Sequence, residues 1–312
     1  MPRRRRRNRR ARREALHFYL FITPWLLGFV GLTLSAIVLG FLMSFTNYDG
    51  FNVDSLRWVG TENYARAFDD TEARYAFGRT FVFLIVAVPG TVFLQLVLAL
   101  LLNSAVRGRG LFRTIFYLPT MIPVVASVWV WKAAAAPEGL INRVIDLLTG
   151  HDPFIHWLVE RPTDVLRVFV MWAWTGVGML IFLAALQGIP TSLREAAAID
   201  GANAVQVARK VVLPLLTPVI FFQLVITLFL AFQVVVEPVL LNPGLGGLAN
   251  PPPRENTLLV VDAFQEAFLS QRFGYSAALL WLLVATAFAV AVALFATARF
   301  WVYYERPGGK GR

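Results

Sequence analysis

The chain has 312 residues, of which 57% are hydrophobic and only 15% are charged. Soluble domains carry about 25% charged residues, so this composition indicates a membrane protein rather than a soluble one. The absence of cysteine excludes disulfides and thiolate chemistry. The three histidines (His17, His151 and His156) lack the spacing of a metal site.

Nine arginines within residues 3–13 supply most of the formal net charge of +10. Such a cluster could bind nucleic acid, but it lies directly before an apolar run that begins at Ala15. Basic residues beside a first span hold it at the cytoplasmic side and contact anionic lipid head groups. We therefore expect a basic cytoplasmic tail over residues 1–14, with membrane lipid and not nucleic acid as its partner. A cleaved signal peptide is disfavoured, since the apolar run exceeds about 7–15 residues.

Stretches without Asp, Glu, Lys or Arg predict an all-α integral membrane domain of six transmembrane helices over residues 15–304. The stretches are 15–48, 80–106, 114–131, 168–193, 211–236 and 273–298. Each has nearly or more than the roughly 20 residues that a helix needs to cross the hydrocarbon, and the alternation of a membrane barrel is missing. Pro119 and Pro123 lie inside the third stretch and predict a kink there.

Charge between the stretches predicts the orientation of the chain. Residues 103–113 hold three arginines and no acid, whereas residues 49–79 hold six acids and four bases, and residues 237–272 hold four acids and two bases. An excess of Lys and Arg marks cytoplasmic loops. Both termini, including a short tail over 305–312, and the segment between the fourth and fifth stretches should therefore be cytoplasmic, and three longer loops should face outward.

A polar segment, about residues 190–214, separates the fourth and fifth stretches. Ser192 and Glu195 have the spacing of a capping box, which predicts the start of a helix. Asp200 and Gly201 then predict a left-handed turn, followed by a second short helix of about 204–210 before Leu213 and Pro214 restart the span. On the residues alone, this segment is equally a structured connection or a docking surface.

Polar groups inside a span are costly and indicate a cavity. Gln233 in the fifth stretch is the main candidate for the substrate path, and Glu237 should follow it on the same helical face, at the outer mouth. Trp172, Gly176 and Met179 share one face of the fourth stretch. They could line the path, although helix packing is the favoured interpretation.

Two other glutamines in the spans, Gln95 and Gln223, are predicted to hydrogen-bond between helices. The chain contains no G-x-x-x-x-G-K-[ST], H-E-x-x-H or G-x-S-x-G motif. It is therefore expected not to be an enzyme and to hold no cofactor of its own. A secondary transporter would require internal repeats and ionisable residues deep in the spans, and neither is visible.

The segment after the fourth stretch resembles the EAA loop of the membrane subunits of bacterial ATP-driven importers. The matching positions, without a gap, are Glu195-Ala196-Ala197, Gly201, Val211 and Leu213-Pro214. Further runs resemble the carbohydrate-importer permeases, of the maltose and glycerol-phosphate kind, and read WVGTENY at 58–64, TIFYLP at 114–119, LQGIP at 186–190 and FGYSAAL at 273–279.

This resemblance implies a permease subunit of the bacterial inner membrane that imports a sugar or oligosaccharide. It implies three kinds of protein partner: a second related permease, a dimer of ATPase subunits that holds ATP and magnesium, and an extracytoplasmic binding protein. The implied ATPase-coupling residues are Glu195, Ala196, Ala197, Asp200, Gly201, Ala202, Leu213 and Pro214. An importer of peptides, polyamines or phosphate is the alternative within the same class.

Two positions depart from the pattern of these permeases. Ala208 stands where the family usually has an aromatic residue that helps to seat the coupling helix. The outer loop at 243–253 replaces the usual Gly-Gly-Pro with PGLGG and a later run of three prolines. The second difference predicts an altered outer loop.

Overall fold

The computed structural model describes residues 3–52, 54, 56–104, 108–151, 154–244 and 251–303, with the side chains described from residue 14 onward. Apart from one isolated bridge between Thr46 and Trp58, the described residues form helices, turns and loops. The predicted tail at 305–312 and most of the altered outer loop lie outside the described residues.

The first half of the chain comprises the following elements. They are α1 (Arg3–Gly28), η1 (Phe29–Leu34), α2 (Ser35–Met43), α3 (Glu62–Asp69), α4 (Thr71–Asn103), α5 (Arg109–Tyr117), η2 (Leu118–Met121), α6 (Val124–Ala134), α7 (Leu140–Thr149) and α8 (Trp157–Glu160).

The second half of the chain follows with the same helical character. Its elements are α9 (Pro162–Gly188), α10 (Thr191–Ile199), α11 (Ala204–Val207), η3 (Ala208–Val212), α12 (Leu213–Ala231), α13 (Val236–Leu240), η4 (Arg254–Asn256), α14 (Leu259–Phe268) and α15 (Phe273–Trp301).

Five continuous helices in the described residues are long and apolar enough to cross a membrane. They are Glu14–Met43, Thr71–Asn103, Pro162–Gly188, Ala204–Ala231 and Phe273–Trp301. Each overlaps one of the predicted stretches. The third stretch is different, because it is not one continuous helix: the chain bends by 108° between α5 with η2 and α6. The kink predicted from Pro119 and Pro123 is confirmed, and a sixth span exists only if this bent pair is counted as one.

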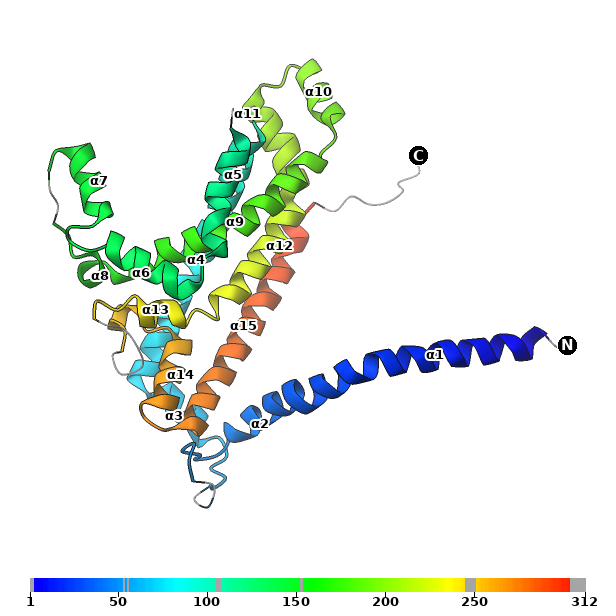
Figure 1. Ribbon diagram of the computed structural model, residues 1–312, viewed down its shortest axis with the longest axis vertical. Coiled ribbons are helices and arrows are strands. Elements are labelled where there is room, and N and C mark those ends of the chain that lie inside the picture. The colour runs from blue at the N-terminus through cyan, green and yellow to red at the C-terminus, as the bar shows by residue number, and fades with distance from the viewer. Residues whose placement is uncertain are drawn as a thin grey trace.

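The long helix formed by α1, η1 and α2 extends away from the other helices (Figure 1). Over the most apolar 18 residues of this helix, no residue is buried against the rest of the chain. Its attachment is at the α2 end, where the ring of Phe41 packs edge-on against Trp281 of α15 at a centroid distance of 4.8 Å. An apolar helix exposed on all sides suits lipid or another membrane subunit as its surroundings.

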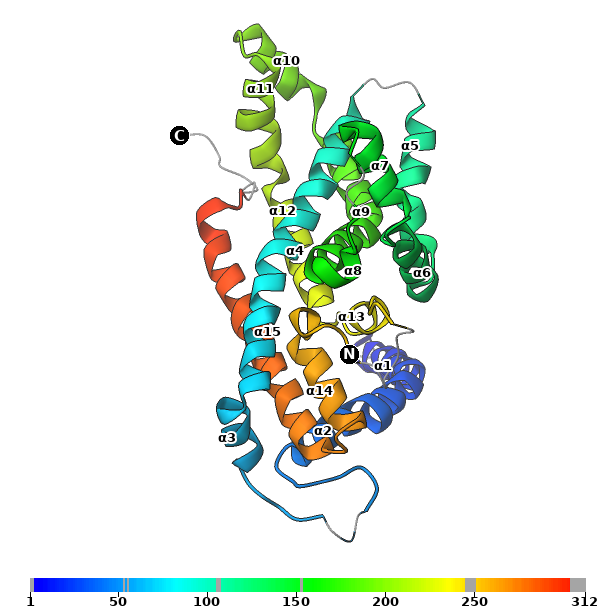
Figure 2. The same cartoon turned by 90° about the vertical axis from the view of Figure 1, so that its left-hand side faces the viewer.

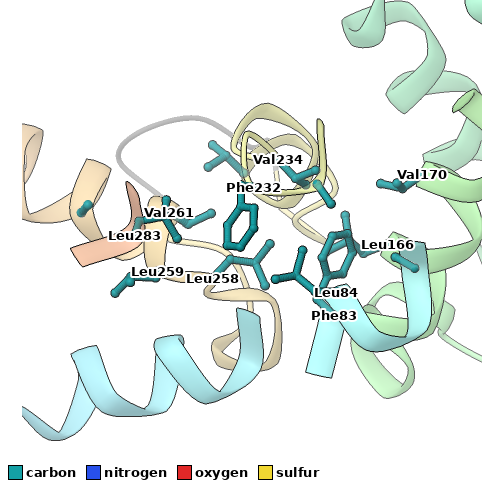
Figure 3. Packing of buried hydrophobic residues seen from close by; sticks show 14 of the residues in the cluster. Phe83, Leu84, Leu166, Val170, Phe232, Val234, Leu258, Leu259, Val261 and Leu283 are labelled. Carbon is teal, nitrogen blue, oxygen red and sulfur yellow. The ribbon is translucent and has the colours of Figure 1, made fainter. Parts of the chain in front are cut away.

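The core of the bundle forms where α4 packs along α9, with α12, α14 and α15 around them (Figure 3). Side chains from five segments of the chain meet there. Those labelled in Figure 3 are Phe83, Leu84, Leu166, Val170, Phe232, Val234, Leu258, Leu259, Val261 and Leu283. A second apolar cluster is formed by Val92, Ala99, Leu102, Met179, Phe182, Leu183, Leu186, Val212 and Leu216. Gln223 hydrogen-bonds to Gln95, which confirms the predicted contact between helices.

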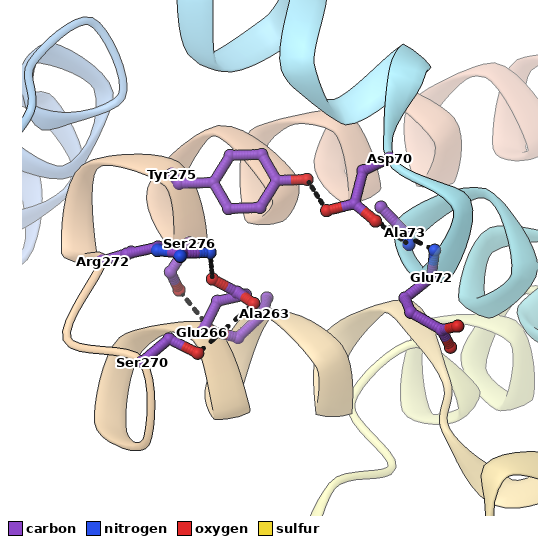
Figure 4. A network of polar contacts seen from close by, with 9 residues as sticks. All are labelled: Asp70, Glu72, Ala73, Ala263, Glu266, Ser270, Arg272, Tyr275 and Ser276. Atoms are coloured by element: carbon purple, nitrogen blue, oxygen red, sulfur yellow. Dashed lines mark hydrogen bonds and ion pairs between the residues drawn. The ribbon is translucent and has the colours of Figure 1, made fainter.

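A polar network fixes the end of the bundle that contains α3, here called the α3 end (Figure 4). Asp70 caps α4 by accepting from the backbone N–H groups of Glu72 (2.9 Å) and Ala73 (3.4 Å), and it also accepts from the Tyr275 hydroxyl (3.0 Å). Burial by itself would raise the pKa of Asp70, but these hydrogen bonds outweigh it and hold the pKa below its ordinary value. The network therefore joins the start of α4 to the first turn of α15.

Candidate functional site

The segment from α10 to η3 projects beyond the other long helices, at the end of the bundle opposite α3 (Figures 1 and 2). Its first helix begins at Thr191 after Pro190, and no side chain caps it. The predicted Ser192–Glu195 capping box is therefore wrong, because the helix starts two residues earlier than that cap requires and Ser192 lies inside it. Pro190 accounts for this start, since its φ of −56° already suits the residue that precedes a helix.

The turn predicted at Asp200 and Gly201 is confirmed. Gly201 has a φ of +80°, in the left-handed region. Its N–H donates to the carbonyl oxygen of Ala198 and the N–H of Ala202 donates to that of Ala197, both at 3.0 Å. These two bonds form a Schellman motif, which ends α10 by satisfying carbonyl groups of its last turn.

The second helix of this segment begins at Ala204, as predicted. Asn203 and Gln206 form a capping box in which each side chain bonds to the other residue's backbone N–H at 2.9 Å. No break follows, because α11 continues through the π-helical η3 into α12. Leu213 and Pro214 thus lie within one continuous helix, in which Pro214 follows almost directly after the π-helical turn of η3.

The α10–α11 hairpin has an exposed surface of mixed character. Ile199 and Val205 are 86% and 74% exposed, which is costly for apolar side chains unless something covers them. The carboxylate of Glu195 is exposed and forms no hydrogen bond or ion pair with any residue that the structure describes. Ala196 is also exposed, and Ala197 is partly buried. An apolar pair beside an unpaired carboxylate forms a surface suited to a partner protein with an apolar groove and a cation.

Ile199 and Val205 were not singled out from the sequence. A signal was present, since both are large apolar residues within a short polar insert. Arg194 was missed as well: its Nη2 donates to the carbonyl oxygen of Leu186 at 3.1 Å. This contact ties α10 to the last turn of α9.

The three candidates of α9 differ in their surroundings. Trp172 is partly buried, with its ring 5.7 Å from that of Trp131 on α6. Met179 is completely buried in the second apolar cluster. Gly176 is buried against the bent segment, where a Cβ atom would lie 2.8 Å from the carbonyl oxygen of Phe116. Packing within this chain therefore accounts for Gly176 and Met179, and Trp172 keeps a partly exposed ring.

Gln233 and Glu237 do not share a helical face. Helix α12 ends at Ala231 and α13 begins at Val236, so the prediction of one continuous helix through both residues is wrong. Gln233 is exposed, and its Nε2 donates to the carbonyl oxygen of Phe229 at 2.9 Å. Glu237 is half-buried, and burial raises the pKa of its carboxyl group. The oxygen of the Gln233 amide accepts no hydrogen bond from any residue that the structure describes.

No cluster of three or more His, Asp or Glu side chains suited to a metal ion occurs among the residues with described positions. The structure thus consists of long apolar helices with the polar α10–α11 hairpin projecting at one end. The opposite end, the α3 end, is held by the polar network of Asp70 and Tyr275.

Comparison with known proteins relates this arrangement to one family. Residues 73–306 match the family described as the inner membrane component of binding-protein-dependent transport systems. A probable ABC transporter permease protein of Bacillus subtilis, YesP, is 35% identical over 96% of both chains. The arabinooligosaccharides transport system permease protein AraP of Halalkalibacterium halodurans is 30% identical over 90% of this chain and 88% of that protein.

A solved structure has a similar fold at lower sequence identity. It is that of a bacterial alginate ABC transporter in complex with an alginate pentasaccharide-bound periplasmic protein. The match has a TM-score of 0.76 and 19% identity, and it covers 92% of this chain and 95% of the other.

Proposed function

Because this chain belongs to the family of inner membrane components of binding-protein-dependent transport systems, we propose that it is a permease subunit that carries a sugar or oligosaccharide across the bacterial inner membrane. It forms part of the translocation path and performs no covalent chemistry. The observation that carries the proposal is the α10–α11 hairpin: a Schellman turn at Gly201 presents Glu195, Ile199 and Val205 on a projecting surface.

The substrate class follows from the relatives. AraP is described as acting in arabinooligosaccharide transport, and the structural neighbour as binding an alginate-loaded periplasmic protein. A neutral sugar requires hydrogen-bond donors and acceptors beside an aromatic face. Gln233 supplies an exposed amide, and Trp172 supplies a partly exposed ring. These two residues are the proposed contacts of this chain with the sugar.

The α10–α11 hairpin is the proposed docking site for a separate ATPase. The chain has no phosphate-binding motif of its own, so ATP and magnesium would be held by that partner. Ile199 and Val205 enter a groove of the ATPase, and Glu195 pairs with one of its cations. Closure of two ATPase subunits on ATP moves the hairpin, and the bond between Arg194 and Leu186 passes the movement to α9.

The proposed orientation places both termini and the hairpin in the cytoplasm and the α3 end outside, following the excess of Lys and Arg. The Arg-rich tail at 1–14 then lies against anionic lipid on the cytoplasmic face. The α3 end faces the extracytoplasmic binding protein. A second, related permease completes the path, and the exposed helix of α1 and α2 lies in the bilayer or against that permease.

Purification through an affinity tag on this chain tests the proposal. We expect an ATPase to co-purify, and Ile199→Asp together with Val205→Asp should release it without unfolding the chain. The reconstituted complex should hydrolyse ATP faster with a sugar-loaded binding protein than with the empty one. An ATPase that stays bound to the double variant would reject the hairpin as the docking site, and stimulation by peptides or phosphate in place of sugars would reject the substrate class.

A further inference from the structure

An apolar groove of about 430 Å³ opens on the side of the bundle between α3, α4 and α15. Figure 2 shows α4 crossing in front of α15, with α3 at the lower end. Leu259 and Leu279, both buried, form part of its lining. Phe77, Ala285 and Ala289 line it too, and all three are exposed at the surface. The groove is therefore accessible from the side that a bilayer would occupy.

The length of the groove matches one leaflet of a membrane. Its lining on α15 extends from Leu279 to Ala289, which is about 15 Å at the helical rise of 1.5 Å per residue. The hydrocarbon of a bilayer is about 30 Å thick, so one leaflet measures about half of that. An acyl chain that enters at the α3 end would reach approximately the middle of the bilayer.

A single cation lies at the α3 end of this groove. Arg74, in the first turn of α4, lines it and is exposed. Its guanidinium forms no hydrogen bond, ion pair or ring contact with any residue in the described part of the chain. Two neighbouring carboxylates are engaged elsewhere, since Asp70 accepts from Tyr275 and Glu72 pairs with Arg254 at 3.0 Å. Arg74 is thus free to bind an external anion.

We propose that this groove binds one anionic phospholipid, with an acyl chain along α15 and the phosphate on Arg74. Arginine suits phosphate because its guanidinium presents a fork of N–H donors. The apolar lining favours a lipid over free phosphate, which would use only the cation. A transmembrane helix about 10–12 Å wide would need more than twice the volume of the groove over the same length, so a helix could lie across the groove but not within it.

This inference rests on the proposed function only in treating the long helices as membrane spans. Native mass spectrometry of the complex purified in detergent through a tag on this chain is the direct measurement. The complex is stripped of lipid and titrated with dioleoyl phosphatidylglycerol or dioleoyl phosphatidylcholine. Lipid binding in detergent requires neither ATP nor sugar, so its failure is distinguishable from a failure of the transport assignment.

Arg74→Gln should weaken the tightest phosphatidylglycerol site about tenfold, as expected for the loss of one charge-assisted hydrogen bond. It should weaken phosphatidylcholine less, because the choline ammonium of that lipid competes with Arg74 for the same phosphate. Ala285→Phe fills the groove and should remove that site for both lipids. The matched controls are Arg143→Gln, an exposed arginine on α7, and Ala296→Phe, an exposed alanine of α15 outside the groove. Neither control should change the titration.

An unchanged titration for Ala285→Phe would overturn the site and indicate that a partner helix covers the groove. Loss of binding in Ala285→Phe but not in Arg74→Gln would overturn the phosphate contact and leave a neutral lipid as the occupant. Competition by inorganic phosphate at the lipid concentration would also reject the proposal, since only the cation would then be used. An unaltered thermal unfolding temperature of both variants shows that they are folded.

Discussion

Gln223 donates a hydrogen bond of 3.0 Å to the amide oxygen of Gln95, and the Nε2 of Gln95 donates one of 2.9 Å to the carbonyl oxygen of Trp174. Both side chains are buried. The two bonds connect α4, α9 and α12 at one level of the bundle. Gly178 makes room for them, because a Cβ atom there would collide with both amides.

Gln95→Leu should destabilise the chain more than Gln223→Leu does. The first change leaves the buried amide of Gln223 without its acceptor, at a cost of about 1–3 kcal/mol, whereas the second leaves Gln95 bonded to Trp174. The double variant should be less destabilised than the sum of the two, with a coupling of about 0.6 kcal/mol typical of membrane helices. Thermal unfolding in detergent measures all three, with the exposed Gln187→Leu as control. Strict additivity would contradict the coupling.

Gly201→Val should leave the subunit inserted and assembled but reduce uptake and substrate-stimulated ATP hydrolysis severely. The strain is confined to the backbone, because a φ of +80° disfavours β-branched residues and a Cβ atom at Gly201 would meet nothing within 4 Å. Gly201→Asn is the matched control, since Asn tolerates left-handed backbone, and it should retain most of the activity. Normal uptake by the Val variant would reject the coupling role.

The long helices could be predicted from charge-free stretches because the side chains that face lipid must be apolar. Their ends could not. Helix α4 begins at Thr71 and carries Arg74 and Arg79 in its first turns, since a helix continues into the polar interface once its N-terminus is capped. Asp70 supplies that cap, and its role becomes evident only with the fold.

The bent segment of α5, η2 and α6 shows which part of a kink can be predicted from nearby prolines. Pro119 and Pro123 predict a kink, but the angle of 108° arises because Ile122, directly before Pro123, is extended, with a ψ of 129°. The residue before a proline avoids the helical region. The direction in which the chain turns at the kink depends on packing against α9, and that packing cannot be read from the sequence.

The break between α12 and α13 has little local signal, since neither Gly nor Pro lies between Ala231 and Val236 and the nearest proline is Pro238, within α13. Phe232 and Val234 are 6% and 1% exposed and enter the same core (Figure 3). Both side chains lie in the non-helical segment between α12 and α13, and their burial in the core stabilises that segment. Tertiary packing thus decided where Gln233 lies.

Labelling of single cysteines tests the orientation, and the native chain has no cysteine background. Asp69→Cys, an exposed position beside the α4 cap, should react with an impermeant maleimide in cells whose outer barrier has been breached. Lys210→Cys, at an exposed position of η3 outside the proposed docking pair, should react only after the inner membrane is opened. Both must react in detergent, as the control for accessibility. Reversed labelling in cells would overturn the proposed topology.

Gln233→Leu should lower uptake several-fold while assembly and basal ATP hydrolysis stay near their wild-type values. The side chain is exposed and bonds only to the backbone of its own last turn, the carbonyl of Phe229, among the contacts described, so its removal costs little stability. Gln223→Leu is the informative counterpart, because it alters a buried amide and should affect stability. Wild-type uptake by Gln233→Leu at all substrate concentrations would place the sugar contact elsewhere.

Asp262 should make the stability of the α3 end depend on pH. Its side chain on α14 is 8% exposed. Burial first, and then the carboxylates of Glu266, Asp70 and Glu72, raise the pKa of Asp262 to about 7. In the unfolded chain its pKa lies near 3.8. Between these two values the unfolded state ionises while the folded state keeps the proton, so the free energy of unfolding falls as pH rises and levels off above about 7.

Asp262→Asn removes this titration and keeps the shape of the side chain. The variant should be more stable than the wild type at pH 8, by on the order of a few kcal/mol. It should be nearly equal to the wild type at pH 3, below the unfolded-state pKa of 3.8, where the carboxyl group is largely protonated in the folded and the unfolded chain. Thermal unfolding of the purified complex across this range measures the difference. Asp69→Asn, an exposed acid nearby, should show no such trend. An equal gain in stability at both pH values would mean that Asn improves packing or hydrogen bonding and that the charge of Asp262 does not destabilise the folded state.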